Sequence, residues 1–188
     1  MYIEKINTPE DIKKYNINEL EVLAQELREA IINKVSDCGG HLASNLGIVE
    51  LTIALHYVFD APKDKFVFDV SHQTYCHKML TGRKAAFIKK ENYKDVTGFS
   101  NPKESEYDLF ALGHTSTSVS LACGLAKARD LKHDSENVIA VIGDASLDGG
   151  EAFEALNCAA EINSNLIVVI NDNEMSIPEN HGALGRHL

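Results

Sequence analysis

The apolar residues form three short continuous runs that predict buried strands, over residues 66–70, 137–142 and 166–170. Each run is rich in valine, isoleucine or phenylalanine and is too short for an ordinary helix. Consecutive apolar positions are typical of strands covered on both faces, as in a parallel sheet. Residues 108–112 offer a weaker fourth strand.

Between these runs the apolar residues recur at helical spacing and predict four helices, over about residues 18–35, 48–59, 115–131 and 149–162. Such a stripe faces the core of the domain. The first helix carries the stripe Leu20, Leu23, Leu27, Ala30, Ile31 and Val35, and the last carries Phe153, Leu156, Ala160 and Ile162.

Polar, aperiodic segments separate these elements. Asn18, with Glu21 three residues later, is typical of a reciprocal helix N-cap. Residues 1–18 and 84–106 are predicted to lie on the surface. Because strands alternate with helices, the pattern predicts an α/β fold with a parallel sheet and helices on both faces.

Composition and charge narrow the class of protein. A net charge of -10 argues against nucleic acid as a partner, since nucleic acid binding needs a basic surface. No apolar run reaches the roughly 20 residues of a membrane span, and no signal peptide is visible at the start. We therefore expect no membrane partner and a cytoplasmic location. The four cysteines are far apart, which favours reduced thiols: Cys38, Cys76, Cys123 and Cys158.

Polar residues follow the last two predicted strands. Gly143 and Asp144 come after the strand over 137–142, and Asn173 follows the strand over 166–170. Because a strand–helix–strand crossover makes the two strands parallel, Asp144 and Asn173 are expected near one edge of the sheet. A carboxylate and an amide oxygen are hard ligands that suit a magnesium ion bound to phosphate. The sequence thus predicts a site for a metal-bound diphosphate.

This spacing resembles the motif of thiamine diphosphate enzymes, and further segments resemble the 1-deoxy-D-xylulose-5-phosphate synthase family in matching order. These segments are residues 39–47 (GGHLASNLG), 68–73 (FDVSHQ), 77–83 (HKMLTGR), 105–108 (SEYD), 113–118 (GHTSTS) and 171–177 (NDNEMSI). The resemblance covers the chain from about residue 16 onward. It implies a thiamine diphosphate-binding, transketolase-like fold that is incomplete at the C-terminus of residues 1–188, with the pyrimidine-binding and C-terminal domains absent.

By resemblance, the function is a transferase with thiamine diphosphate and Mg2+ as cofactors. The family joins pyruvate and glyceraldehyde 3-phosphate to give 1-deoxy-D-xylulose 5-phosphate and CO2, for isoprenoid and thiamine biosynthesis. A homodimer, or a second chain supplying the pyrimidine-binding domain, is expected, and the isolated chain is expected to be inactive. Two alternatives remain: the small subunit of a split transketolase-like enzyme, and a non-catalytic remnant or binding module.

The resemblance also implies roles for individual residues. The catalytic candidates are His41, His72 and His114. The candidates for metal binding are Asp144, Asn173 and the backbone carbonyl of Met175. The candidates for cofactor binding are His72, Gly113, His114, Thr115, Gly143, Asp144, Ala145, Ser146 and Asn173.

Two residues depart from the family pattern. Ala145 and Ser71 stand where glycine is usual. Alanine is tolerable at residue 145 if φ there is negative, but strain of about 1 kcal/mol follows if φ is positive. In the second case we expect weaker cofactor binding.

Plainer interpretations accompany these assignments. Residues 115–118 are suited to capping a helix as well as to contacting phosphate. A zinc site built from His72, Cys76 and His77 is a minor alternative, because the spacing does not align on one helix face. The chain contains neither a GxGxxG motif after a strand nor a phosphate-binding GxxxxGK[ST] loop.

Overall fold

The computed structural model describes residues 1–173 of the chain. Its strands are β1 (Lys65–Phe68), β2 (Val138–Gly143) and β3 (Leu166–Asn171). Its α-helices are α1 (Ile17–Cys38), α2 (Ala43–Leu46), α3 (Val49–Val58), α4 (Tyr75–Lys78), α5 (Ala85–Ile88), α6 (Ser118–Lys132), α7 (Asp144–Leu147) and α8 (Gly150–Ile162). Short 3-10 helices span Ile3–Lys5, Pro9–Lys14 and Lys90–Asn92, and the turn Met79–Arg83 extends α4.

The three strands form one parallel sheet in the order β1-β2-β3. The first pairing sets Phe68 of β1 opposite Val141, and the second sets Gly143 of β2 opposite Asn171 of β3. All three predicted strands are therefore confirmed, with small shifts at their ends. The weaker strand over residues 108–112 is wrong, because this segment has no regular secondary structure.

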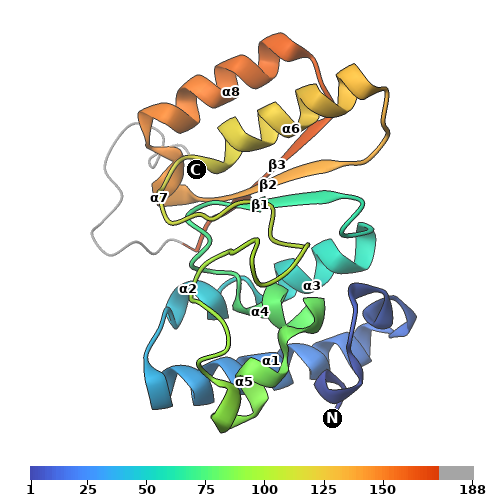
Figure 1. The fold of residues 1–188 in the computed structure, drawn as a ribbon, viewed down its shortest axis with the longest axis vertical. Helices are drawn as coiled ribbons and strands as arrows, with labels where there is room; N and C mark the ends of the chain where they lie inside the picture. Colours follow the sequence, from blue (N-terminus) through green and yellow to red (C-terminus); the bar gives the residue numbers. More distant parts are fainter. Residues whose placement is uncertain (174–188) are drawn as a thin grey trace.

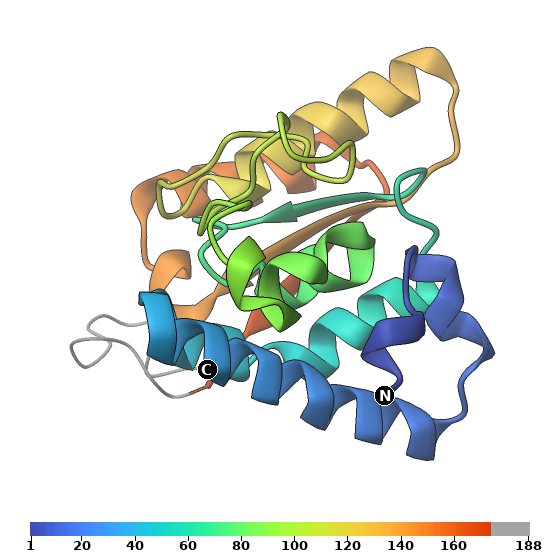
Figure 2. The ribbon, with the colours of Figure 1, turned by 60° about the horizontal axis from the view of Figure 1, so that its bottom comes forward.

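Helices cover both faces of the sheet, as predicted (Figure 1). Side chains alternate along β2, so Ala140 and Ile142 pack with α6 and α8, whereas Ile139 and Val141 pack with α3. In Figure 1, α4 lies beside α3, and its His77 contacts Phe68 of β1, whereas α1 and α5 lie farther from the sheet on that face. Figure 2 also shows α1 farther from the sheet than α3. In the part of the chain that the structure describes, no helix combines the length and apolar character needed to cross a membrane.

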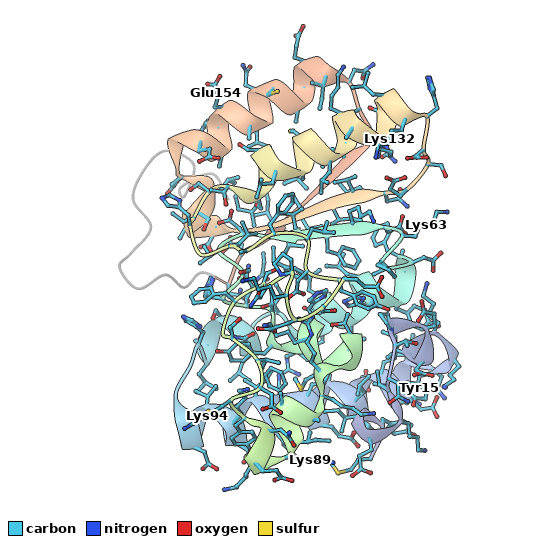
Figure 3. All side chains as sticks on the ribbon, in the orientation of Figure 1. Tyr15, Lys63, Lys89, Lys94, Lys132 and Glu154 are labelled. Carbon is cyan, nitrogen blue, oxygen red and sulfur yellow. The ribbon has the colours of Figure 1, made fainter. Side chains whose placement is uncertain are left out.

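The N-terminal region corrects two predictions. The cap of α1 is Asn16, whose side chain accepts from the Glu19 backbone N–H at 3.1 Å, and the Glu19 carboxylate accepts from the Asn16 N–H at 2.8 Å. Residues 1–18 do not simply coat the surface, since Ile3, Ile6 and Ile12 are buried in the core with α1 and α5. The edge-on contact of Tyr15, labelled in Figure 3, with Tyr2 completes this packing.

Two further predictions of exposure need correction. In the segment 84–106, Phe87 is fully buried against the core of α1, so the segment is only partly a surface excursion. In α8, Phe153 and Ala160 are exposed, whereas Leu156 and Ile162 of the predicted stripe do pack on the core, together with Ala152 and Ala155. The prediction for this helix is therefore half confirmed.

Candidate functional site

The carboxyl ends of the strands bring the predicted acid and amide to one edge of the sheet. Gly143 pairs with Asn171, so Asp144 and Asn173 follow directly on neighbouring strands. Asp144 is buried at the start of α7, and Asn173 is exposed. The Asn173 amide lies against Gly47, where an added Cβ would come within 3.0 Å of its Oδ1 atom. Met175 lies outside the described residues.

The structure answers the question raised by Ala145. This residue lies inside α7 with right-handed helical backbone, and its methyl group faces solvent. Gly143, the N-cap of α7, has a φ of -81°. Because neither residue needs the left-handed region, alanine at position 145 adds no backbone strain.

A buried carboxylate organises the segment that contains His114 and Thr115. Asp69 follows β1, is 1% exposed, and accepts from the backbone N–H groups of Ser116 and Ser118, each at 2.9 Å. These two bonds hold the start of α6 against the end of β1. The plainer interpretation, in which residues 115–118 cap a helix, is wrong, because the N-cap Thr117 makes no side-chain cap bond; the carboxylate that holds the helix start comes from a distant part of the chain.

The same segment is joined to α7 by hydroxyl groups. Ser116 donates its hydroxyl to the Ser146 carbonyl at 2.7 Å, and the Thr115 and Ser146 hydroxyls lie 2.7 Å apart. A Cβ at Gly149 would come within 1.9 Å of Ser116 Oγ, so only glycine fits there. His114 is exposed, and its Nδ1 lies 2.7 Å from the Thr115 carbonyl oxygen.

His41 and His72 form a pair beside this edge. Their ring centroids are 5.4 Å apart in an edge-to-face arrangement, and Phe99 contacts His41 from another side at 5.2 Å. Within residues 1–173, the buried Nδ1 atoms of both rings have no hydrogen-bond partner. Burial lowers the pKa of His72, and the neighbouring His41 lowers it further, whereas Asp69 acts in the opposite direction. Neutral His72 therefore predominates at pH 7.

The residue that joins the two histidine loops was missed from the sequence. Asn45 in α2 is fully buried, and its Nδ2 donates to the backbone carbonyls of His41 at 2.6 Å and His72 at 2.8 Å. Its Oδ1 accepts from the Tyr75 N–H at 2.9 Å. Asn45 lies in the GGHLASNLG motif, but its residue type alone gives no sign of this role.

A separate group of buried ionisable side chains is centred on Asp108 and Glu104. Asp108 accepts two bonds from the Arg83 guanidinium, at 2.7 and 2.9 Å, and one from His77 Nε2 at 3.2 Å. The fully buried Lys78 donates to Glu104 at 2.6 Å, and Glu104 also lies 3.5 Å from Arg83. We call these five residues the charge cluster.

The charge cluster bears on the minor zinc alternative. Because the Asp108 carboxylate can only accept, His77 donates through Nε2 and accepts at Nδ1 from His56 Nε2, 2.9 Å away. Both ring nitrogens of His77 are therefore engaged. Burial raises the pKa of the Cys76 thiol, which disfavours the thiolate that zinc requires. No group of three histidine, cysteine or acidic residues in the described region is placed to hold a metal.

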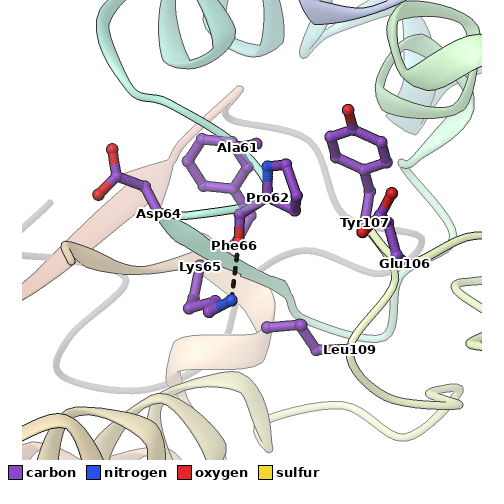
Figure 4. Close-up of a pocket in the computed structure, with 8 residues that line it drawn as sticks. All are labelled: Ala61, Pro62, Asp64, Lys65, Phe66, Glu106, Tyr107 and Leu109. Carbon is purple, nitrogen blue, oxygen red and sulfur yellow. Dashed lines mark hydrogen bonds between the residues drawn. The ribbon is translucent and has the colours of Figure 1, made fainter. Parts of the chain in front are cut away.

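Two hollows in the described part of the surface lie away from this edge. One recess near the start of β1 has a volume of about 10 Å³, room for about one water molecule (Figure 4). Its lining includes Pro62, whose carbonyl accepts from Lys65 Nζ at 2.8 Å. An open polar groove of about 350 Å³ lies between residues 129–136 and 163–165. Neither includes a predicted site residue, so the candidate site rests on the convergence of side chains at the carboxyl edge.

A parallel sheet with helices on both faces, and with polar residues following all three strands at its carboxyl edge, defines an α/β domain of the class that binds ligands at that edge. A family model described as 1-deoxy-D-xylulose-5-phosphate synthase matches residues 3–188. The chain belongs to this family, and it corresponds to the N-terminal part of its members.

Two relatives give the extent of the similarity. The chain is 58% identical over 186 residues to 1-deoxy-D-xylulose-5-phosphate synthase of Carboxydothermus hydrogenoformans, covering 99% of this chain and 30% of that protein. It is 56% identical over 188 residues to the synthase of Dictyoglomus turgidum, covering 100% of this chain and 30% of that protein. The chain thus spans about 30% of the length of these curated relatives.

Proposed function

We propose that this chain is the cofactor-anchoring part of a 1-deoxy-D-xylulose-5-phosphate synthase. The whole enzyme would convert pyruvate and glyceraldehyde 3-phosphate to 1-deoxy-D-xylulose 5-phosphate and CO2, using thiamine diphosphate and Mg2+ in the cytoplasm. The main support is the meeting of Asp144, Asn173 and the His114–Ser146 region at one sheet edge, within a chain of this family. The pyrimidine-binding domain would come from further chain or from a partner, in a dimeric enzyme.

The residues present fit such a group. Asp144 and Asn173 offer the carboxylate and amide oxygens that Mg2+ prefers, and Met175 would add its carbonyl. The absence of a side chain at Gly149 lets the start of α8 pack directly on Ser116, which holds the His114–Ser118 segment beside Asp144 and Ser146. When bound, thiamine diphosphate supplies the carbon that carries the two-carbon unit of pyruvate after CO2 is lost.

The histidines would handle protons around this group. Because the pKa of His72 is lowered, its neutral ring can accept a proton at the unpartnered Nδ1 at pH 7. His41 offers a second such Nδ1 beside it. In His114 the Nδ1–H donates to the Thr115 carbonyl, which leaves Nε2 of the neutral ring as an acceptor.

Titration calorimetry of the purified chain tests the anchoring role directly. Inorganic diphosphate and thiamine diphosphate are each titrated with Mg2+ and with a chelator. We expect Asp144→Ala, or removal of Mg2+, to weaken binding by about tenfold or more, since even supporting groups around metals carry effects of that size. Asp148→Ala removes a nearby acid of the same type and should bind like the parent chain. Equal affinity in all conditions would contradict the metal assignment.

A further inference from the structure

The segment Thr97–Asn101, which we call the clamp loop, lies against the His41 side of the histidine pair. The Phe99 ring packs edge-on against the His41 ring, with an interplanar angle of 68°. A Cβ at Gly98 would lie 3.8 Å from His41 Nδ1 and 3.4 Å from the Tyr75 hydroxyl. The clamp loop therefore packs on the His41 ring through Phe99, and Gly98 lies beside the ring edge that carries the unpartnered Nδ1.

Two adjacent backbone N–H groups hold the clamp loop in this position. The Ser100 N–H donates to the Ser71 hydroxyl at 2.9 Å, and the Asn101 N–H donates to Asp108 Oδ2 at 2.8 Å. The second bond ties the loop to the charge cluster. The first depends on one hydroxyl, and Ser71 immediately precedes His72.

Ser71 holds an unusual backbone conformation. It is fully buried with a φ of 68°, next to Val70 with a φ of 56°. Non-glycine residues rarely adopt this left-handed region, and they carry strain there that the surrounding structure must offset. Glycine would remove the strain, but it has no hydroxyl to bind Ser100. Serine at position 71 therefore carries backbone strain that glycine would avoid, but it provides the hydrogen bond to the clamp loop.

We propose that Ser71 is a positioning residue whose hydroxyl fixes the clamp loop against His41 and so keeps water from the His41–His72 pair. The proposal rests on the proposed function, which places proton transfer at these rings. Two observations support the exclusion of water: both Nδ1 atoms are buried, and burial is the main influence on the His72 ring. The ionisable groups that face His72 are His41 and Asp69, and neither is part of the clamp loop.

Two substitutions distinguish the effect of losing the Ser71 hydroxyl from the effect of relieving the backbone strain. Ser71→Ala loses the hydroxyl and keeps the strained conformation, whereas Ser71→Gly loses both. Hydrogen exchange of the Ser100 N–H in the purified chain should speed up by about tenfold in each variant, the size of effect that one hydrogen bond carries. The melting temperature should be higher for Ser71→Gly than for Ser71→Ala, because only glycine relieves the strain.

Titration of His72 by NMR distinguishes positioning from general loosening. In both Ser71 variants the pKa of His72 should move up towards the ordinary value, since the opened loop admits water. Thr52→Val serves as the control, because it deletes another fully buried hydroxyl, which donates to the Ile48 carbonyl at the start of α3 and also contacts the Cys76 thiol, away from Ser100 and His72. It should change neither the Ser100 exchange nor the His72 titration.

Unchanged Ser100 exchange in both Ser71 variants would overturn the proposal, and so would an equal shift of His72 in the Thr52→Val control. These measurements need no cofactor. If the calorimetry with Asp144→Ala contradicts metal binding, the proposed function fails, but the role of Ser71 in holding the clamp loop is unaffected. If the Ser71 variants behave like the parent chain, the role of Ser71 fails, but the proposed function is unaffected.

Discussion

Two buried carboxylates support the candidate site, and they are stabilised in different ways. Asp108 is surrounded by charge, with Arg83 and His77 bonded to its oxygens. Burial alone would raise the pKa of Asp108, but the hydrogen bonds from His77 and Arg83 outweigh burial and hold it well below its usual range. Asp69 forms no ion pair within residues 1–173, and its oxygens accept from the backbone N–H groups of Ser116 and Ser118.

This difference in partners predicts different roles for the two carboxylates: one stabilises the whole fold, and the other fixes the local geometry of the site. Removing one partner of a buried ion pair leaves an uncompensated charge, so the cost spreads to the whole fold. Removing an acceptor from neutral N–H groups leaves a local defect, whose cost is that of one or two unsatisfied donors. We therefore expect Asp108 to control stability and Asp69 to control the geometry of the site edge.

The largest expected effect is that of Asp108→Asn. Arg83 would lose its bidentate partner inside the protein, so unfolding free energy should fall by about 3–5 kcal/mol. Urea denaturation at pH 7 measures this loss. Asp130→Asn removes an exposed carboxylate, and the buried Arg129 keeps its bonds to the Glu136 and Asn165 carbonyls, so the loss should be much smaller. Equal losses of unfolding free energy in the two variants would contradict the special role of Asp108 in stability.

Acid should destabilise the fold through two buried histidines, His77 of the charge cluster and its neighbour His56. Burial lowers the pKa of His56 well below its usual value and also lowers that of His77. Both rings are thus neutral in the fold, whereas the unfolded chain binds protons below about pH 6.5. Because the unfolded state holds more protons there, stability is full above that pH and falls as the pH drops below it.

The slope of the unfolding free energy against pH can be measured by urea denaturation between pH 8 and pH 5. Each buried histidine should contribute up to about 1.4 kcal/mol per pH unit below its unfolded pKa. His56→Asn keeps a side-chain N–H for His77 but cannot titrate, so its slope should be smaller. A slope equal to that of the parent chain would show that His56 is not held neutral.

The sequence predicted the sheet well because each strand is a short continuous apolar run, fully buried in β2 and half-buried in β3. Continuous apolar residues in β2 and β3 leave little ambiguity about strand or helix, and their carboxyl ends then place Asp144 near Asn173. The N-cap of α1 was placed two residues late because Asn16–Glu19 and Asn18–Glu21 have the same spacing. Only the hydrogen bonds of the folded helix distinguish them.

The rest of the site depends on contacts between distant segments. The role of Asn45 follows from the meeting of the His41 and His72 loops, which no local pattern encodes. Asp69 lies within a recognised motif, yet its partners are 47 and 49 residues further along the chain. Motifs thus identified the segments of the site, and the tertiary fold assigned the residues that hold them together.

A smaller, local effect is expected for Asp69→Asn. The amide would present a donor to two N–H donors, so one acceptor is lost at a cost of about 1–3 kcal/mol. Hydrogen exchange should rise at Ser116 and Ser118. Asp64→Asn is the matched control, because Asp64 is a buried carboxylate that accepts from the Asn137 N–H at 2.7 Å near the other end of β1. Its variant should leave the Ser116 and Ser118 exchange unchanged.

The smallest effect should come from Ala145→Gly, although residue 145 departs from the family pattern. Ala145 is helical and exposed, so glycine gains no conformation that the structure uses and costs roughly 0.5–1 kcal/mol of stability. Diphosphate affinity, measured by calorimetry with Mg2+, should stay unchanged, because Asp69 and the hydroxyls of Ser116 and Ser146 hold the edge in place. A large gain in affinity would show instead that the backbone at residue 145 leaves its helical conformation when the ligand binds.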